Sequence, residues 1–157
     1  MIDVQAYMNL NTLYADYVAA VDSNDWAAWT ELFAEDCEYK VQPRENFERG
    51  FPLSTLWLLS KNMLKDRAYG IQETLFHDPY YQRHVVGAPR ILSFENGVIQ
   101  SEANYAVFRT KYDGESTVFN VGRYLDKVIA TDGGLKFKER FCIYDSEMIP
   151  NSIIYPI

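Results

Sequence analysis

The second half of the chain consists of long strand-like runs separated by tight-turn signals. The turn signals are ENG at residues 95–97, DG at 113–114 and DGG at 132–134. Asn-Gly and Asp-Gly favour two-residue hairpin turns, because both central residues of such a turn need a positive φ. The runs around these turns are rich in β-branched and aromatic residues: VIQSEANYAVFRTKY, STVFNVGRYLDKVIA and LKFKERFCIYD. The pattern predicts an antiparallel meander.

The length of these runs constrains the fold further. They hold 11 to 15 residues, whereas ordinary strands have about 5–6. A straight 15-residue strand would span about 50 Å, which is too long for a compact domain of 157 residues. The strands must therefore bend or bulge, and Gly122 is a candidate for such a bend.

The first half of the chain shows helical periodicity instead. A helix is predicted to end near residues 22–24, with its apolar positions on one stripe: Leu10, Leu13, Tyr14, Tyr17, Val18 and Val21. A second helix is predicted over residues 25–36, with Trp26, Trp29 and Phe33 on its buried side. A short strand (37–41), a polar loop (42–52) and a third helix (roughly 52–65) are expected to follow.

A long, bent meander must bury its concave face, and only the three helices can cover it. We therefore expect an α+β architecture in which a curved antiparallel sheet wraps around helices to form a cone. No repeat, low-complexity segment or linker divides the chain, so residues 1–157 are expected to form a single domain.

The charge and the termini exclude several classes of function. The formal net charge is -7, and no run of more than two Lys or Arg residues occurs, which argues against nucleic-acid and membrane-surface partners. The N-terminal residues do not resemble a signal peptide, and no apolar run approaches the length of a membrane span. We expect a cytoplasmic protein in which Cys37 and Cys142 are reduced thiols.

The chain lacks the residues for the common metal and nucleophile sites. A Rieske cluster needs two Cys and two His, and a mononuclear iron triad needs two His and a carboxylate. The only histidines are His77 and His84, and an odd spacing of seven would point them to opposite faces of a strand. Phosphate-binding loops and the G-x-S-x-G nucleophile motif are also missing. The sequence therefore predicts no metal-binding, cofactor-binding or nucleophilic residue.

Acid–base chemistry stays open as an alternative. If Tyr14, Tyr17, Asp36 and His84 converged at the mouth of the cone, they could transfer protons as in a free-standing isomerase or dehydratase. The competing interpretation is that both tyrosines are core residues whose hydroxyls find a hydrogen-bonding partner.

Three blocks in order carry a family resemblance: AVDSNDWAAWTELFAEDCEYKV (20–41), NMLKDRAYGIQETLFHDPYYQRHVVGAPRI (62–91) and FNVGRYLDKVIATDGGLKFKERFCIYDS (119–146). They resemble the small (beta) subunit of aromatic-ring-hydroxylating, Rieske non-heme iron dioxygenases, over nearly the whole chain. Within the family, the chain is most similar to small subunits of oxygenases that act on monocyclic aromatic acids, such as salicylate 5-hydroxylase and terephthalate dioxygenase. The resemblance implies a salicylate-like substrate for the complex.

The resemblance also implies a nuclear-transport-factor-like (cystatin-like) cone and a partner. In this family the large (alpha) subunit carries the Rieske [2Fe-2S] cluster, the mononuclear Fe(II) and the substrate pocket, usually in an α3β3 heterohexamer. Electrons come from NAD(P)H through a reductase and a ferredoxin. The small subunit is structural, so this chain is expected to contain no catalytic residue.

The resemblance leads us to expect structural or interface roles for Arg83 and His84, the RH pair on a strand after the third helix. The same roles are expected for Arg123, Tyr124, Arg140, Ile154 and Tyr155. The segment at residues 149–157, IPNSIIYPI, has no charged side chain and must be covered. It can fold back over its own sheet or pack at a subunit boundary, and the sequence leaves both open.

Overall fold

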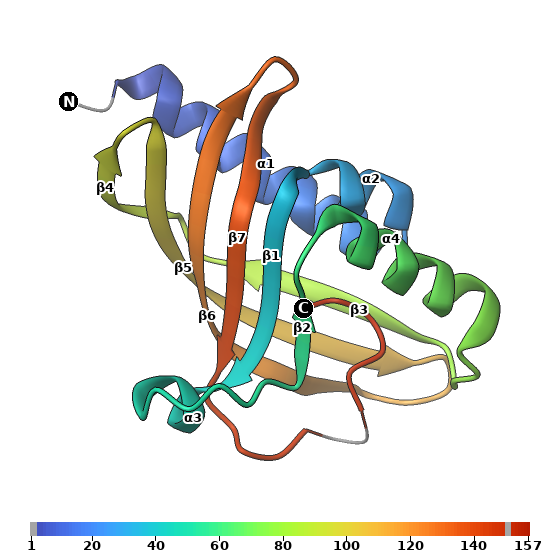
Figure 1. Cartoon of the computed structure of the whole chain (residues 1–157). Coiled ribbons are helices and arrows are strands. Elements are labelled where there is room, and N and C mark those ends of the chain that lie inside the picture. Colours follow the sequence, from blue (N-terminus) through green and yellow to red (C-terminus); the bar gives the residue numbers. More distant parts are fainter. Residues whose placement is uncertain (1–2, 150–151) are drawn as a thin grey trace.

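The computed structural model describes residues 3–149 and 152–157, and within them one strongly curved sheet wraps around helices (Figure 1). The strands are β1 (Phe33–Pro43), β2 (Leu56–Leu58), β3 (Tyr80–Val86), β4 (Arg90–Glu95), β5 (Val98–Lys111), β6 (Ser116–Thr131) and β7 (Gly134–Tyr144). Their order is β2-β1-β7-β6-β5-β3, and β4 also pairs with β5. β1 runs parallel to β7, and the other pairs are antiparallel. The predicted α+β cone is confirmed, with a mixed rather than a purely antiparallel sheet.

The predicted meander corresponds to β5, β6 and β7, which have 14, 16 and 11 residues. The strands bend where their register shifts: between Val107 and Phe108 in the β5–β6 pair, and between Lys127 and Val128 in the β6–β7 pair. At Gly122 the neighbouring strand comes so close that an added Cβ would lie 2.0 Å from the carbonyl oxygen of Ile143. The prediction that the long strands bulge is confirmed, whereas a bend at Gly122 itself stays a prediction, because Gly122 lies in regular register with Tyr105 and Tyr144.

Three helices lie against the concave face of the sheet, as Figure 1 shows for α1 (Val4–Asp22), α2 (Trp26–Glu31) and α4 (Lys61–Tyr69). Each begins at a side-chain cap, in which Asp3, Asp25 and Ser60 accept a hydrogen bond from a main-chain N–H three residues on. A π-helical turn, η1 (Gly70–Thr74), continues α4. The buried stripe of α1 matches the predicted one, except that Val18 is only half-buried.

Two predicted helices had the wrong bounds. The second helix ends at Glu31, and Phe33 is the first residue of β1, which is longer than the predicted strand. The third helix begins at Lys61 rather than near residue 52. The predicted polar loop contains a short helix, α3 (Arg44–Glu48), which has ion pairs from Arg44 to Glu48 and from Arg49 to Glu45, both at 2.8 Å.

The error at the third helix has a tertiary cause. Residues 56–58 look apolar enough for a helix, but they pair with β1 as the edge strand β2, where Leu58 is buried and Trp57 faces outward. The next good helix start is Ser60, whose side chain accepts a hydrogen bond from the N–H of Met63 at 3.2 Å. Pairing with β1 therefore overrides the local apolar pattern.

Aromatic rings fill the space between helices and sheet. Tyr17 of α1, Phe33 of β1 and Phe137 of β7 meet with ring centroids 5.5–6.3 Å apart, and Trp29 contacts Phe33 at 5.6 Å. Such pairs add to the burial of apolar area through their edge-to-face geometry. The core therefore occupies the interior of the cone, where a ligand pocket would otherwise lie.

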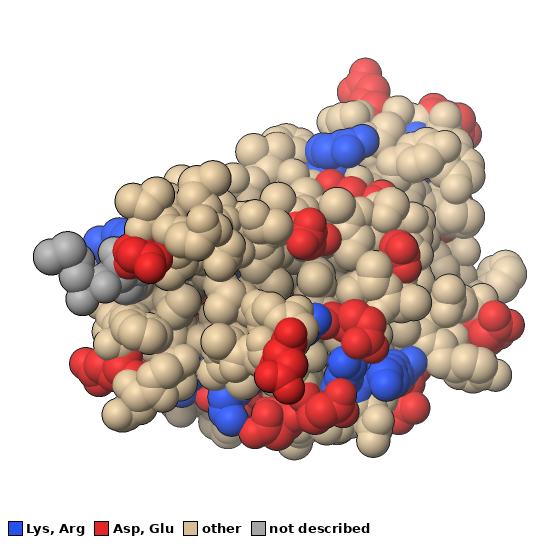
Figure 2. Space-filling view, turned by 90° about the horizontal axis from the view of Figure 1, so that it is seen from above, with Lys and Arg blue, Asp and Glu red and all other residues tan. Residues whose placement is uncertain are grey.

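On the face seen from above in Figure 2, basic side chains lie among acidic ones and form no continuous basic patch. Among the described residues, no helix is both long enough and apolar enough to cross a bilayer.

Candidate functional site

A buried ion pair lies at the centre of the cone. Arg140 of β7 donates from Nε and Nη2 to the two carboxylate oxygens of Asp126 on β6, at 2.9 and 2.8 Å. Both side chains are completely shielded from solvent. The guanidinium also lies 4.0–4.7 Å from the centroids of four aromatic rings: Tyr14, Tyr17, Tyr124 and Phe137. Burial alone would lower the pKa of Arg140, but the charge and hydrogen bonds of Asp126 raise it above its usual value, so the guanidinium stays charged.

Tyr14 of α1 closes this cluster. Its hydroxyl donates to Asp126 and lies 3.1 Å from the Ser101 hydroxyl. Burial raises the pKa of Tyr14, and the negative charge of Asp126 raises it further. A phenol whose pKa is raised so far keeps its proton at neutral pH. Tyr14 is therefore suited to hold Asp126 in place and poorly suited to act as a general base.

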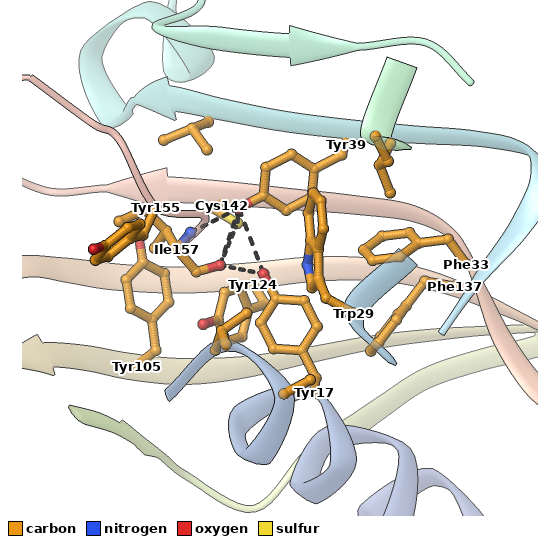
Figure 3. Close-up of a cluster of buried hydrophobic side chains, with 14 of the residues drawn as sticks. Tyr17, Trp29, Phe33, Tyr39, Tyr105, Tyr124, Phe137, Cys142, Tyr155 and Ile157 are labelled. Atoms are coloured by element: carbon orange, nitrogen blue, oxygen red, sulfur yellow. Dashed lines mark hydrogen bonds between the residues drawn. The ribbon is translucent and has the colours of Figure 1, made fainter. Parts of the chain in front are cut away.

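A second polar group surrounds the main chain of Ile157. The Tyr17 hydroxyl donates to the Ile157 carbonyl oxygen, and Tyr39 donates to the same oxygen at 3.0 Å (Figure 3). The Ile157 N–H donates to the Tyr39 hydroxyl at 2.8 Å. The Cys142 sulfur lies 3.6 Å from the Tyr39 hydroxyl oxygen and 3.6 Å from the Ile157 carbonyl oxygen. Burial raises the pKa of the Cys142 thiol to about 12. Ile157 thus lies inside the cone.

His84 of β3 forms a separate contact with the last residue of α1. Its Nδ1 lies 2.6 Å from Asp22 Oδ1, and its main-chain N–H donates to Asp22 Oδ2 at 3.0 Å. The imidazole is fully buried and Asp22 nearly so. The pair lies along an open groove between α1 and β3 that Tyr14 and Arg83 also line. His84 thereby ties the end of α1 to the sheet, and a structural role for it stays a prediction.

The four proposed acid–base residues do not converge at one mouth. Tyr14 and His84 share the groove, but Tyr17 points at the Ile157 carbonyl inside the cone. Asp36 lies on the outer surface, where it accepts a hydrogen bond from Lys138 at 2.7 Å. That hydrogen bond and the charge of Lys138 lower the pKa of Asp36. The prediction of a converging set is wrong, because alternation along β1 turns Asp36 outward while Cys37 and Tyr39 face inward.

The residues expected to have structural or interface roles fall into two groups. Tyr124, Arg140 and Tyr155 are buried in the chain's own interior, as His84 is. Arg83 is exposed, and Arg123 and Ile154 are partly exposed. Arg123 lies 3.7 Å from Glu102 and stacks over Phe47 at 5.8 Å. An interface role for the three accessible residues stays a prediction.

Sequence reasoning missed three partners of these groups: Asp22, Asp126 and Tyr39. A signal for Asp126 was present, because it falls between Tyr124 and Val128 on the inward, period-two positions of its strand. A charged residue on a buried strand face needs a partner, and Arg140 is on the adjacent strand. The contacts to Ile157 left no such signal, since they are made by hydroxyls to a main-chain oxygen.

The described residues place no group of three His, Cys, Asp or Glu side chains where a metal ion could bind. His77 and His84 contact different partners: His77 Nε2 lies 2.9 Å from the Tyr155 hydroxyl, whereas His84 contacts Asp22. These residues do not fit a Rieske cluster or a mononuclear iron site.

Comparison with known proteins agrees with this geometry. Residues 3–141 match the SnoaL-like domain, whose cone resembles that of nuclear transport factor. The chain is 30% identical to the anthranilate 1,2-dioxygenase small subunit of Burkholderia cepacia, over 99% of this chain and 96% of that one. It is 32% identical to a beta subunit of the terminal oxygenase component of terephthalate 1,2-dioxygenase from Comamonas sp, over 91% and 93% of the two chains.

A solved structure shows the same relationship. A beta subunit assigned to an aromatic-ring-hydroxylating dioxygenase of Novosphingobium aromaticivorans superposes with a TM-score of 0.88 and 32% identity, over 98% of this chain and 97% of that one. The family model, the sequence relatives and this structure agree over almost the whole length of the chain. The protein belongs to the SnoaL-like domain family and, within it, to the small subunits of aromatic-ring-hydroxylating dioxygenases.

Proposed function

We propose that this chain is the structural, non-catalytic small subunit of a terminal oxygenase that hydroxylates a monocyclic aromatic acid with O2. Its partner is a large subunit that carries the Rieske [2Fe-2S] cluster and the mononuclear Fe(II), in an α3β3 complex. A ferredoxin and an NAD(P)H reductase supply the electrons. Salicylate-like compounds are the proposed substrates.

The filled interior of the cone is the observation that carries this proposal. An enzyme with this fold would need an open compartment with polar groups free to meet a substrate. Here Arg140 and Asp126 are paired with each other, Tyr14 donates to Asp126, and Tyr17 donates to Ile157. These four polar side chains are instead used to hold the core together.

The substrate class rests on the relatives. Two of them are named for anthranilate and terephthalate, which are both monocyclic aromatic acids. Selection of the substrate is proposed to lie in the large subunit, because the cone of this chain is filled by its own side chains.

Exposed apolar residues support a partner. Phe51, Leu53, Trp57 and Leu59, around the edge strand β2, are 43–72% exposed. Such clusters on a soluble protein mark interaction surfaces. Stable subunits commonly bury more than about 2,000 Å² in apolar interfaces.

Co-expression with the cognate large subunit tests the proposal. Purified through a tag on this chain, the two subunits should elute together in equal amounts, with the visible absorbance of an iron–sulfur protein. The chain purified alone should be colourless and contain no stoichiometric iron. Stoichiometric iron in the lone chain, or turnover of an aromatic acid by the lone chain, would refute the proposal.

A further inference from the structure

The outer, convex face of the sheet is apolar where β3, β5 and β6 lie side by side (Figure 1). On β3, buried and exposed side chains alternate, so its exposed positions point away from the helices. Residues directly opposite each other on paired strands share a face of the sheet. The strand register therefore puts nine outward-facing residues in three rows: Tyr81, Thr110 and Ser116; Arg83, Phe108 and Val118; and Val85, Ala106 and Val121. We call these nine residues the outer patch.

The composition of the outer patch is unusual for the solvent face of a sheet, which is ordinarily polar. Val85 and Val118 are each 57% exposed, and Val121 is 40% exposed. The hydroxyls of Thr110 and Ser116 lie 2.7 Å apart and hydrogen-bond to each other. The outer patch thus offers a contiguous apolar surface, and such surfaces mark sites of interaction.

Arg83 is the charged residue of the outer patch. Its side chain is exposed, and it takes part in none of the ion pairs between described residues. The arginines that do form ion pairs there are Arg44, Arg49, Arg90, Arg123 and Arg140. A guanidinium buried without a counter-charge is costly. A partner that covers the outer patch therefore has to supply a carboxylate.

This charge argues against a second copy of the chain docked around a two-fold axis. Such a contact is self-complementary, so each patch would have to provide what the other needs. The outer patch contains no acidic residue. Asp145 extends its third row by donating its main-chain N–H to the Val121 carbonyl oxygen at 2.8 Å, but its carboxylate is paired with Arg44 at 3.4 Å. Two facing patches would bury two arginines without partners.

We propose that the outer patch is a docking surface for the large oxygenase subunit, and that Arg83 pairs there with a carboxylate set in an apolar surface of that subunit. This inference rests on the proposed function and deepens it, because it names the surface and the chemistry of the contact. β2 and β3 are at opposite ends of the strand order. The outer patch is therefore separate from the exposed apolar residues around β2.

Co-purification of the large subunit through a tag on this chain measures the contact. Arg83→Glu reverses the charge, and Val118→Asp puts a carboxylate between the apolar rows. Each should lower the amount of large subunit retained at least about tenfold, as expected when an interfacial charge pair or its apolar surroundings are disrupted. Lys65→Glu is the matched control, because it makes the same change of charge at an exposed residue of α4, on the helical side of the molecule. It should retain as much large subunit as the wild type.

The variants are first compared with the wild type by circular dichroism and thermal unfolding. Their midpoints should stay close to that of the wild type, because the substituted side chains are exposed. Full retention of the large subunit by both patch variants would overturn the docking surface and leave the proposed function intact. A wild-type chain that retains no large subunit would instead refute the proposed function, and the docking surface with it.

The occupant is identified with the photo-reactive residue p-benzoylphenylalanine in place of Val118. Irradiation of the assembled complex should cross-link this chain to the large subunit, whereas the same residue in place of Lys65 should give no such product. Cross-links between two copies of this chain would assign the outer patch to a second copy and overturn the proposal. So would a lone wild-type chain that forms oligomers which Arg83→Glu converts to monomers.

Discussion

Arg140 is the residue on which the interior of the cone depends most. Its charge is balanced by Asp126, and its guanidinium is enclosed by aromatic rings. Taking two charges out of water is costly, and the cost is recovered only when both partners are present and hydrogen-bonded. The pair therefore specifies how β6, β7 and α1 meet, whatever its net contribution to the free energy of unfolding.

Replacing Arg140 with Met should destabilise the chain by about 3–5 kcal/mol, because Asp126 is left as an uncompensated buried charge. Urea denaturation followed by tryptophan fluorescence measures the loss. Lys138→Met is the control: its ion pair with Asp36 is on the outer surface, so its unfolding midpoint should stay close to that of the wild type. Similar midpoints for the two variants would contradict the central role of the buried pair.

The buried thiol of Cys142 predicts instability at alkaline pH. Burial raises its pKa from 9.0 to about 12. As the pH rises through this range, the unfolded chain loses the proton before the folded chain does, so the free energy of unfolding falls. Urea unfolding at about pH 8 and about pH 11 should show this fall, to which the buried tyrosines also contribute. Cys142→Ala should lose less stability between the two pH values, and an identical loss would count against burial as the cause.

For single residues, the sequence indicated which side chains face the core but not which other residues they contact. Tyr14, Tyr17 and His84 were predicted as core or structural residues, and they are buried. Asp22 and His84 are 62 residues apart in the chain, and Tyr39 and Ile157 are 118 apart. Contacts at such separations depend on how the sheet curves, which periodicity does not encode.

Among the elements, the pairing of β6 with β7 leaves no room for a side chain at Gly122. An added Cβ would lie 2.0 Å from the Ile143 carbonyl oxygen and 2.7 Å from the Cα of Tyr144. Both are main-chain atoms that cannot move aside without breaking the strand pairing.

Gly122→Ala should therefore abolish folding or lower the free energy of unfolding by more than about 3 kcal/mol. Gly133→Ala is a matched control in the β6–β7 turn, where the nearest atom is the flexible end of Lys136 at 3.6 Å. The two variants are compared by circular dichroism and thermal unfolding. A soluble Gly122→Ala chain with the thermal midpoint of the control would show that the strands do not need this close approach.

Element types were largely predictable from the sequence, and the errors occurred where pairing partners were distant. The meander and the first helix have strong, long patterns, and both are present. β2 is only three residues long and depends on pairing with β1, so its residues were mistaken for part of a helix. The parallel contact between β1 and β7 also joins distant segments, and no local signal indicates it.

For the whole molecule, the cone follows from long strands that must bend and from helices that must cover their concave face. What the cone contains decides the function. This chain fills it with aromatic rings, an ion pair and its own residues 153–157. The fold can host enzymes and subunits alike, and the filled interior favours the subunit.

The central claim is that the chain supports an oxygenase without taking part in its chemistry. Turnover per assembled complex, normalised to iron, tests it most directly when wild type is compared with a chain carrying Tyr14→Phe and His84→Gln. These substitutions remove the two acid–base candidates that share the groove beside α1. The account predicts turnover within about twofold of wild type, with any loss confined to the yield of complex. A fall of about a hundredfold or more, as expected when a general acid or base is removed, would contradict it.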